Sequence, residues 1–371
     1  MQKPLLQRIQ VAALAAAAGA ASTGAPAADS PASTLSQVLA SSGITASGYL
    51  AASYYESSGT NTYHQFDTSR DTFQLDQAAL QLAYQPKSGF GAVVSVIAGE
   101  DAKIVDAAES AGASDHSFDV LQGFAQYVTG PVTLQAGKFT TLAGAEVIAP
   151  TGNTNFSRSL LFFGEPLTHT GVRATYAITD TVSVTAGINN GWNYTKINYG
   201  SKTGELGIAL TPNKLFSITA QLYAGKDPVY AAKRTLIDTV ATFNATAALS
   251  FVVSYDWGKQ ETGGATPAGL TGGDWEGLAG YVNYQLSSEW RLSVRAEYLD
   301  DKDGTTLLTG TRQDLKEGTV TLGYDPAASF ELRLEGRYDT STESTFVKST
   351  TPVARFSDNQ TEVAVQGVYK F

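Results

Sequence analysis

The stretch FELRLEGRYD (Phe330–Asp339) alternates between uncharged and charged residues over ten positions. Successive side chains of a β-strand point to opposite faces, so the large apolar residues lie on one face and all five charges on the other. A strand with lipid or a protein core on one side and water on the other has this pattern. The stretch WRLSVRAEY (Trp290–Tyr298) repeats it.

The same period of two recurs from Ile44 to the C-terminus and predicts about sixteen strands. Their lengths match the ~9–11 residues that a tilted strand needs to cross a bilayer. The predicted spans are 44–55, 72–85, 89–100, 118–129, 131–140, 169–178, 181–190, 203–211, 214–224, 235–243, 247–259, 274–285, 288–300, 313–325, 328–340 and 359–371.

The connections between these strands alternate between tight turns, such as Pro212-Asn213, and long polar loops. Outer-membrane barrels have short periplasmic turns and long outer loops, and an even strand number places both termini in the periplasm. The sequence therefore predicts an all-β protein, a transmembrane antiparallel up-and-down β-barrel over residues 44–371.

Aromatic residues occur at both ends of the predicted strands, as membrane interfaces favour. A soluble β-sandwich is the competing prediction, but it does not explain two aromatic belts in phase with loop length. The belt near the short turns would contain Tyr84, Tyr127, Tyr176, Tyr284, Tyr324 and Tyr369, and the belt near the long loops Tyr54, Trp192, Tyr223, Trp257, Tyr298 and Tyr338.

One predicted strand does not keep its phase. Phe73 and Leu75 are odd-numbered, whereas Leu80 and Leu82 are even-numbered. A β-bulge near Gln77-Ala78 would restore the alternation. Alternatively, the first residues lie above the membrane, where no alternation is required.

The composition excludes several classes of protein. Only 16% of the 371 residues are charged, against roughly 25% in ordinary globular proteins. A net charge of −10 argues against a nucleic-acid partner, which needs a basic surface. The chain has no Cys and three His, so we expect no thiolate metal site, little histidine-based metal chemistry and no cofactor.

The N-terminus has the order of an export signal: Lys3 and Arg8, then an apolar Ala-rich stretch, then small residues. We predict a signal peptide at 1–27, whose removal leaves a net charge of −12, and a short periplasmic segment at 28–43. The protein would be exported to the cell outer membrane.

The middle of the chain resembles a known family. The stretches NTNFSRSL (153–160), GEPLTHTGVRATY (164–176) and GINNGWN (187–193) are similar to the β-barrel porin family of the OmpL-like type, and the likeness covers about 44–371. The resemblance implies a water-filled channel for passive diffusion of small polar solutes and ions, surrounded by outer-membrane lipid, with no catalytic residue. The terminal YKF (369–371) looks like the signal that outer-membrane assembly machinery reads, ending in Phe371.

The longest connection, about 141–168, is the candidate pore constriction. It contains Glu146, Arg158 and Glu165, and an apolar run at 160–163 that would be unfavourable in water. By analogy with general diffusion porins, we expect it to fold into the lumen, with Arg158 at the narrowest point. The alternative is a surface loop.

Charged residues of the strands would face the lumen, because Arg on the lipid face costs ~2–4 kcal/mol near the midplane. Their mixed signs suggest a field across water with little ion selectivity, or mutual pairing between strands. Ser293, on the same face, should also meet water. The predicted lumen-facing charges are Arg173, Arg291, Arg295, Glu297, Glu331, Arg333, Glu335 and Arg337.

Acidic residues of the long loops would attract cations to the channel mouth only weakly, because exposed charges act over about 8–10 Å at physiological salt. The residues expected there are Asp101, Asp106, Glu109, Asp115, Asp300, Asp301 and Asp303.

A second class of function is an outer-membrane enzyme or adhesin on a barrel with a filled lumen. His64, His116 and His169 are the possible bases, but none belongs to a recognisable Ser–His–acid motif. We therefore predict a channel rather than an enzyme. The sequence leaves monomer and homotrimer both open.

Overall fold

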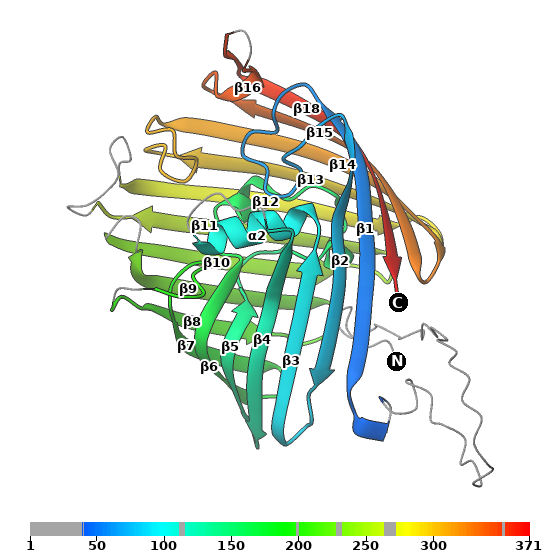
Figure 1. Ribbon diagram of the computed structural model, residues 1–371, viewed down its shortest axis with the longest axis vertical. Helices are drawn as coiled ribbons and strands as arrows, with labels where there is room; N and C mark the ends of the chain where they lie inside the picture. Colours follow the sequence, from blue (N-terminus) through cyan, green and yellow to red (C-terminus); the bar gives the residue numbers. More distant parts are fainter. Residues whose placement is uncertain are drawn as a thin grey trace, which may run out of the picture.

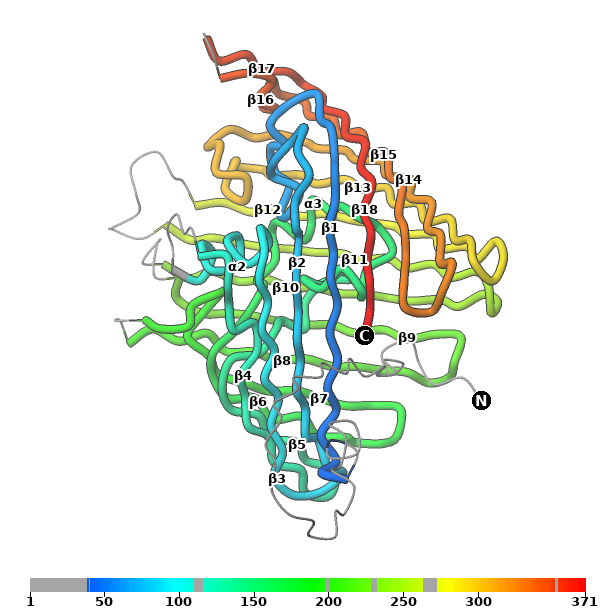
Figure 2. Tube along the Cα trace, turned by 45° about the vertical axis from the view of Figure 1, so that its right-hand side comes forward, coloured from blue at the N-terminus to red at the C-terminus, as the bar shows by residue number. Residues whose placement is uncertain are grey.

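The computed structural model describes residues 41–110, 116–197, 200–227, 232–262, 272–350 and 353–371, together with Leu39. The predicted signal peptide at 1–27 and nearly all of the predicted segment 28–43 lie outside these residues. Sixteen strands of the described chain form a closed antiparallel barrel, which β1 and β18 close side by side (Figures 1 and 2). The predicted fold class is confirmed.

No predicted barrel strand ends more than three residues from its observed bound, because lipid on one face enforces the alternation. The barrel strands are β1 (Thr45–Ser57), β2 (Thr72–Tyr84), β3 (Gly89–Ala98), β4 (Phe118–Thr129), β5 (Val132–Thr140), β6 (Thr168–Thr179), β7 (Val182–Asn189), β8 (Thr203–Leu210), β9 (Phe216–Asp227), β10 (Ala232–Asn244), β11 (Leu249–Gln260), β12 (Gly273–Gln285), β13 (Trp290–Asp301), β14 (Gln313–Ala327), β15 (Phe330–Ser341) and β18 (Asn359–Lys370).

The remaining elements lie in the long connections. β16 (Phe346–Ser349) and β17 (Arg355–Ser357) pair as a separate small sheet. Among the described residues, the connections contain the helices α2 (Glu100–Ser110) and α3 (Leu160–Phe163) and the 3-10 turn η2 (Pro150–Gly152). Within the described residues, none of the helices has the length and apolarity to cross a membrane.

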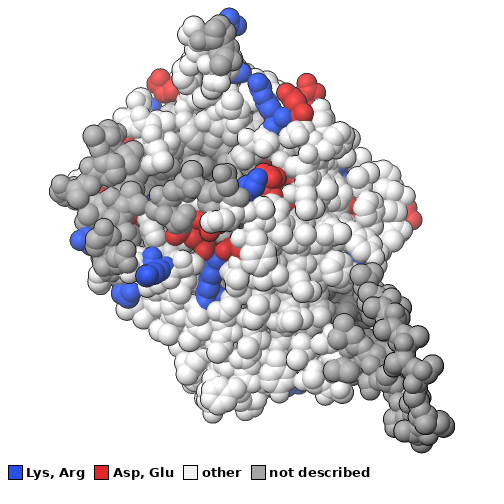
Figure 3. All heavy atoms as spheres, viewed as in Figure 1, with Lys and Arg blue, Asp and Glu red and all other residues white. Residues whose placement is uncertain are grey.

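The two faces of the barrel differ as the alternation predicts. On β15, Leu334 is 51% exposed on the outer face, while its neighbour Arg333 is 1% exposed inside. Figure 3 shows few charged side chains over the lower part of the barrel, where β2–β6 lie in the same view. The outer face is thus an apolar surface suited to lipid.

Two members of the predicted outer aromatic belt are inside the barrel instead. Tyr223 on β9 is fully buried, and Trp192 is buried after β7. Both pack in one apolar cluster with Leu236 of β10 and Trp275 of β12. These rings fill space within the barrel rather than anchoring it at the membrane surface.

The predicted bulge is confirmed, one residue earlier than expected. Ala51 pairs with Gln77 and Ala52 with Leu75, so Asp76 is the extra residue of the bulge and has no residue directly opposite it in the register of β1. Asp76 is thereby turned inward, where it accepts hydrogen bonds from Ser53 Oγ (2.6 Å) and Gln366 Nε2 (2.7 Å). The bulge lets a carboxylate join the polar interior without breaking the apolar outer face.

Candidate pore and its inserted segments

Three connections fold into the barrel and pack together: residues 58–71 between β1 and β2, the helix α2, and residues 141–167 between β5 and β6, called here the inserted segment. Phe66, Val105 and Phe162, one from each, belong to a single buried apolar cluster. The ring centroids of Phe66 and Phe162 are 5.9 Å apart. Figure 1 shows α2 within the ring of strands. The three connections therefore form one packed unit in the lumen.

The inserted segment reaches the opposite wall of the barrel. It leaves from β5, and β13 is eight strands from β5 in either direction around the ring. Glu146 Oε1 lies 2.8 Å from Arg295 Nη1 of β13. The amides of Leu160 and Leu161 donate to Glu297, also on β13 (3.1 and 3.3 Å). The segment thus spans the lumen.

A second wall strand, β15, also holds the inserted segment. The amides of Phe156 and Ser157 donate to the two oxygens of Glu335 (2.6 and 2.9 Å). Arg333 donates to the carbonyls of Pro150 and Asn153, both at 3.0 Å. Because the segment is largely irregular, its backbone groups need such partners when they are buried.

Arg158 is located within the inserted segment, but its charge does not face open water. Its guanidinium donates to the carbonyls of Val147 (2.9 Å), Ile148 (2.7 Å) and Phe156 (2.7 Å). It also lies over the ring of Phe66, 5.3 Å from the centroid. Burial lowers the pKa of Arg158. Arg158 therefore lies in the segment that crosses the lumen, and its side chain ties this segment to itself.

Glu165 is buried in a group of three carboxylates with Asp238 of β10 and Asp256 of β11. The two aspartates face each other directly across the strand pair. Burial and these like charges raise the pKa of Glu165 well above its usual range. Gly144, at a φ of +86°, leaves the space that the Glu165 carboxylate occupies. The group has the geometry to hold a cation, as does the group of His64, Asp67 and Glu362.

The predicted lumen-facing charges lie inside the barrel and make ion pairs or polar contacts with the protein. Arg295 lies within 3.2 Å of Glu146, Glu297 and Glu317. The other pairs are Arg173 with Glu205 (2.8 Å), Arg291 with Glu331 (2.6 Å), Arg333 with Glu331 (2.8 Å) and Arg337 with Asp339 (2.8 Å). These contacts fit the interpretation that the charges pair with one another better than the interpretation that they form a field across open water.

Ser293 and four of the expected mouth carboxylates are not exposed as predicted. Ser293 is fully buried. Asp101 and Glu109 are buried on α2, and Asp300 and Asp301 are buried at the end of β13. Asp115 lies outside the described residues. Alternation alone does not reveal that these positions are covered by other parts of the chain.

A cavity of about 1050 Å³ remains beside the inserted segment. It extends to the barrel end that carries the short turns, since Ser329 of the turn between β14 and β15 and the C-terminal Phe371 line it. Its polar wall carries hydroxyl and amide groups, and the charged members of its lining are Glu146 and Lys370. The rest of its lining is apolar, so it forms a vestibule of mixed character on the short-turn side of the segment.

The predicted candidate bases have other contacts. His64 lies among carboxylates, with Nδ1 2.5 Å from Asp67 Oδ2. His169 Nδ1 lies 3.1 Å from the carbonyl oxygen of Gly191, and its ring stacks on Tyr223. His116 Nδ1 is 3.0 Å from Asp106. These contacts do not have the form of a nucleophile, base and acid in series.

Sequence reasoning missed the apolar residues that fill the outer half of the lumen. Leu236, Leu299 and Leu315 are fully or almost fully buried in one cluster with Leu160 of the inserted segment. A signal was present: Leu236-Ile237 and Tyr298-Leu299 are adjacent apolar pairs in alternating strands. One member of each pair must face inward.

A closed sixteen-strand barrel with an apolar outer face and a segment folded across its lumen defines the class of outer-membrane channel proteins. The family model described as "Putative beta-barrel porin-2, OmpL-like" matches residues 43–371. The chain belongs to this family and is a porin of the cell outer membrane.

Solved outer-membrane proteins share the fold at low sequence identity. OmpT of Vibrio cholerae has 14% identity and a TM-score of 0.60, over 88% of this chain and 97% of that chain. The channel DcaP of Acinetobacter baumannii has 13% identity and a TM-score of 0.60, with the same coverage. OprB of Pseudomonas putida has 12% identity and a TM-score of 0.61, over 90% and 96%. No curated protein matches the chain in sequence.

Proposed function

We propose that this porin is a passive channel for small polar solutes and ions, and that the inserted segment sets its cross-section. The observation that carries the proposal is the path of the segment from β5 to the opposite strand β13, where Glu146 forms an ion pair with Arg295. Glu146, Arg158 and Glu165 then act by fixing the segment in place.

The lining supports polar solutes without strong preference for charge. The vestibule presents side chains such as Ser47, Gln81 and Thr140, which can replace the water around a sugar or polyol. The wall arginines are paired with carboxylates, so little net field remains for selecting ions by sign.

Planar-bilayer conductance tests this proposal. The variant replaces residues 145–163 by a short Gly–Ser linker, which removes the crossing but keeps both flanking strands. We expect open-channel steps for the wild type and steps several-fold larger for the variant, with faster entry of larger sugars in liposome swelling. Equal conductance of the two assembled proteins would refute the role of the segment.

The filled outer half of the lumen favours a second candidate, an adhesin or enzyme on a closed barrel. Leu236, Trp275 and Leu299 are buried in one apolar cluster inside the barrel, so these wall residues do not line a water-filled passage. A wild-type protein that is assembled but silent in bilayers would support this candidate over the channel.

We further propose a homotrimer in the membrane. One structure of Vibrio cholerae OmpT, 12% identical to this chain, is described as a trimer form. Light scattering of the purified protein in detergent should give three chains per particle. A mass of one chain would refute it.

Assembly is proposed to depend on the C-terminus and on removal of residues 1–27. The backbone N–H of Phe371 donates to the carbonyl of Gly48, and the reverse bond is also formed, both at 2.9 Å. Deleting Phe371 should lower the yield of assembled barrel in cells more than in detergent refolding, if assembly machinery reads this residue. Equal losses in both would show a role in closing the barrel alone.

A further inference from the structure

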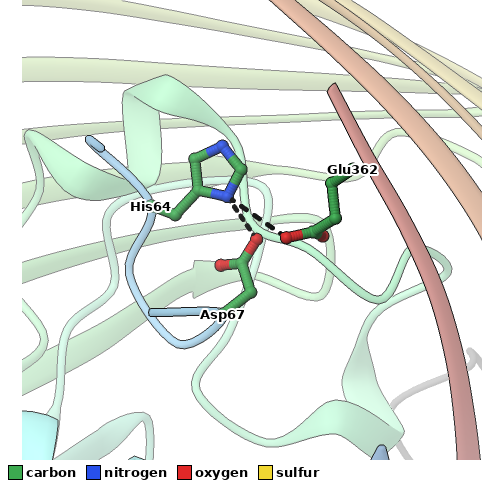
Figure 4. Close-up of side chains that lie close together, drawn as sticks. All are labelled: His64, Asp67 and Glu362. Atoms are coloured by element: carbon green, nitrogen blue, oxygen red, sulfur yellow. Dashed lines mark hydrogen bonds and ion pairs between the residues drawn. The ribbon is translucent and has the colours of Figure 1, made fainter. Parts of the chain in front are cut away.

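The connection between β1 and β2 brings a histidine between two carboxylates inside the barrel. His64 Nδ1 lies 2.5 Å from Asp67 Oδ2 and 3.8 Å from Glu362 Oε2 of β18. All three side chains are buried. Figure 4 shows both carboxylates directed at the same ring nitrogen.

The other ring nitrogen is already occupied. His64 Nε2 lies 3.1 Å from Asp339 Oδ2 of β15. Gln360 Nε2 is 2.9 Å from the same ring nitrogen and donates to the carbonyl of Thr62 (3.0 Å) and to Asp339 Oδ2 (3.3 Å). A proton on Nε2, donated to Asp339, leaves the lone pair on Nδ1, facing Asp67 and Glu362. A carboxylate on the far nitrogen is the usual arrangement behind a metal-binding histidine.

The cluster also contains buried oxygens that no group of the described residues satisfies. They are Asp67 Oδ1, Glu362 Oε1 and, independently of the acidic groups, the amide oxygen of Asn61. The Asn61 amide nitrogen donates to Glu362 Oε2 and to the carbonyl of Asp67 (2.6 Å), so its head group lies on the cluster. An unsatisfied buried acceptor is unfavourable, and all three belong to residues that contact one another in this cluster.

Two carboxyl groups and an imidazole share this buried place. Arg337 Nη2 pairs with Asp339 at 2.8 Å, and the two neutralise each other. Buried charge without a partner is strongly unfavourable, so Asp67 and Glu362 need two compensating positive charges. Two protons, one on Glu362 and one on His64, supply them without a metal. A divalent cation supplies the same two charges and releases both protons.

We propose that His64 Nδ1, Asp67 and Glu362 bind one divalent transition-metal ion of the zinc class. One nitrogen and two carboxylate ligands are a set that Zn²⁺ accepts, with a fourth position for water or the Asn61 oxygen. The ligand atoms lie within 4.8 Å of one another. Tetrahedral ligands at ~2.1 Å from zinc are about 3.4 Å apart. To reach this spacing from His64 Nδ1, the Asp67 oxygen has to move away and the Glu362 oxygen has to move closer, each by less than about 1 Å.

The bound ion fastens residues 58–71 to β18 and holds them in the lumen. Phe66, which directly precedes Asp67 in the chain, packs on Phe162 of the inserted segment. The metal therefore stabilises the first of the three inserted connections, whatever solute the channel carries.

The experiment is a metal titration of the assembled full chain in detergent after treatment with a chelator. Isothermal titration with Zn²⁺ should show one site per chain. His64→Gln and Glu362→Gln should weaken binding at least tenfold, while His116→Gln and Glu165→Gln, which change an exposed histidine and the other carboxylate group, should not. Cu²⁺ bound to the wild type should give an electron paramagnetic resonance spectrum with coupling to a single nitrogen, lost in His64→Gln.

Heat-modified gel mobility confirms that each variant is assembled, and Asp67→Asn replaces His64→Gln if the latter does not assemble. No saturable binding by the assembled wild type overturns the proposal. So does equal affinity in the His64 and His116 variants. Either result would identify the cluster as an ion-paired imidazolium without metal.

Discussion

Arg295→Met tests whether the buried charges anchor the inserted segment. The arginine is fully buried and lies within 3.2 Å of Glu146, Glu297 and Glu317. Methionine has similar length but no charge, so three carboxylates lose the cation that they share. Removing one partner of a buried ion pair costs about 3–5 kcal/mol. We expect a loss of this size in the free energy of unfolding.

The matched control is Arg312→Met. The Arg312 side chain is 65% exposed and makes one ion pair, with Asp300 at 3.3 Å. Asp300 is buried, but water solvates the Arg312 guanidinium, so this pair is far weaker than the pairs of Arg295 and the variant should lose only about 1 kcal/mol.

Urea unfolding in lipid vesicles, followed by tryptophan fluorescence, measures both variants, and limited proteolysis reports release of residues 141–167. Adding Glu146→Gln to Arg295→Met should recover part of the loss, because one fewer unpaired carboxylate remains. Equal losses at positions 295 and 312, or no increase in cleavage of the segment, would refute the reasoning.

Three further predictions concern other parts of the barrel. Leu332→Arg, on the lipid face, should lower the stability of the assembled barrel by ~2–4 kcal/mol. Ser293→Arg should also prevent assembly, because the serine is fully buried and leaves no space for arginine. High assembly yields from both variants would contradict the face assignment. Burial raises the pKa of Asp101 well above its usual range, so docking of α2 should strengthen as pH falls through that raised value; the protection of the α2 amides, relative to their intrinsic exchange rate at each pH, should increase as pH falls, and Asp101→Asn should remove this dependence. Glu165→Gln should raise the free energy of unfolding by on the order of 1 kcal/mol, and the thermal midpoint with it, because it removes a carboxyl group that the buried site must either protonate or hold ionised beside two other carboxylates; a lower midpoint would show instead that a cation holds the group.

The barrel itself could be predicted from the sequence because lipid imposes a rule on every strand. An outward residue must be apolar, so Leu332 and Leu334 fix the face of β15, and the tight turns fix the order of the strands. Even the bulge at Asp76 was visible as a change of phase. The physical constraint is local, and a local pattern therefore reveals it.

The interior could not be predicted in the same way, because water and buried protein both accept polar residues. Ser293 and Arg295 satisfy the alternation equally well in an open pore and beneath an inserted segment. Tyr223 satisfies it as a belt residue, yet its ring is inside, 4.7 Å from His169. The deciding contacts join residues far apart in the chain, and no local pattern contains them.

The wall carboxylates and the irregular backbone of the inserted segment explain each other. A segment with little helix or strand brings unpaired N–H groups into the lumen, and each must find an acceptor. Glu335 supplies both of its oxygens to two successive amides, and Glu297 does the same for two others. Arg295 lies 3.2 Å from Glu297 and also contacts Glu146 of the inserted segment at 2.8 Å. The alternating acids and arginines of β13 and β15 are therefore better understood as a binding surface for the protein's own chain than as a filter for ions.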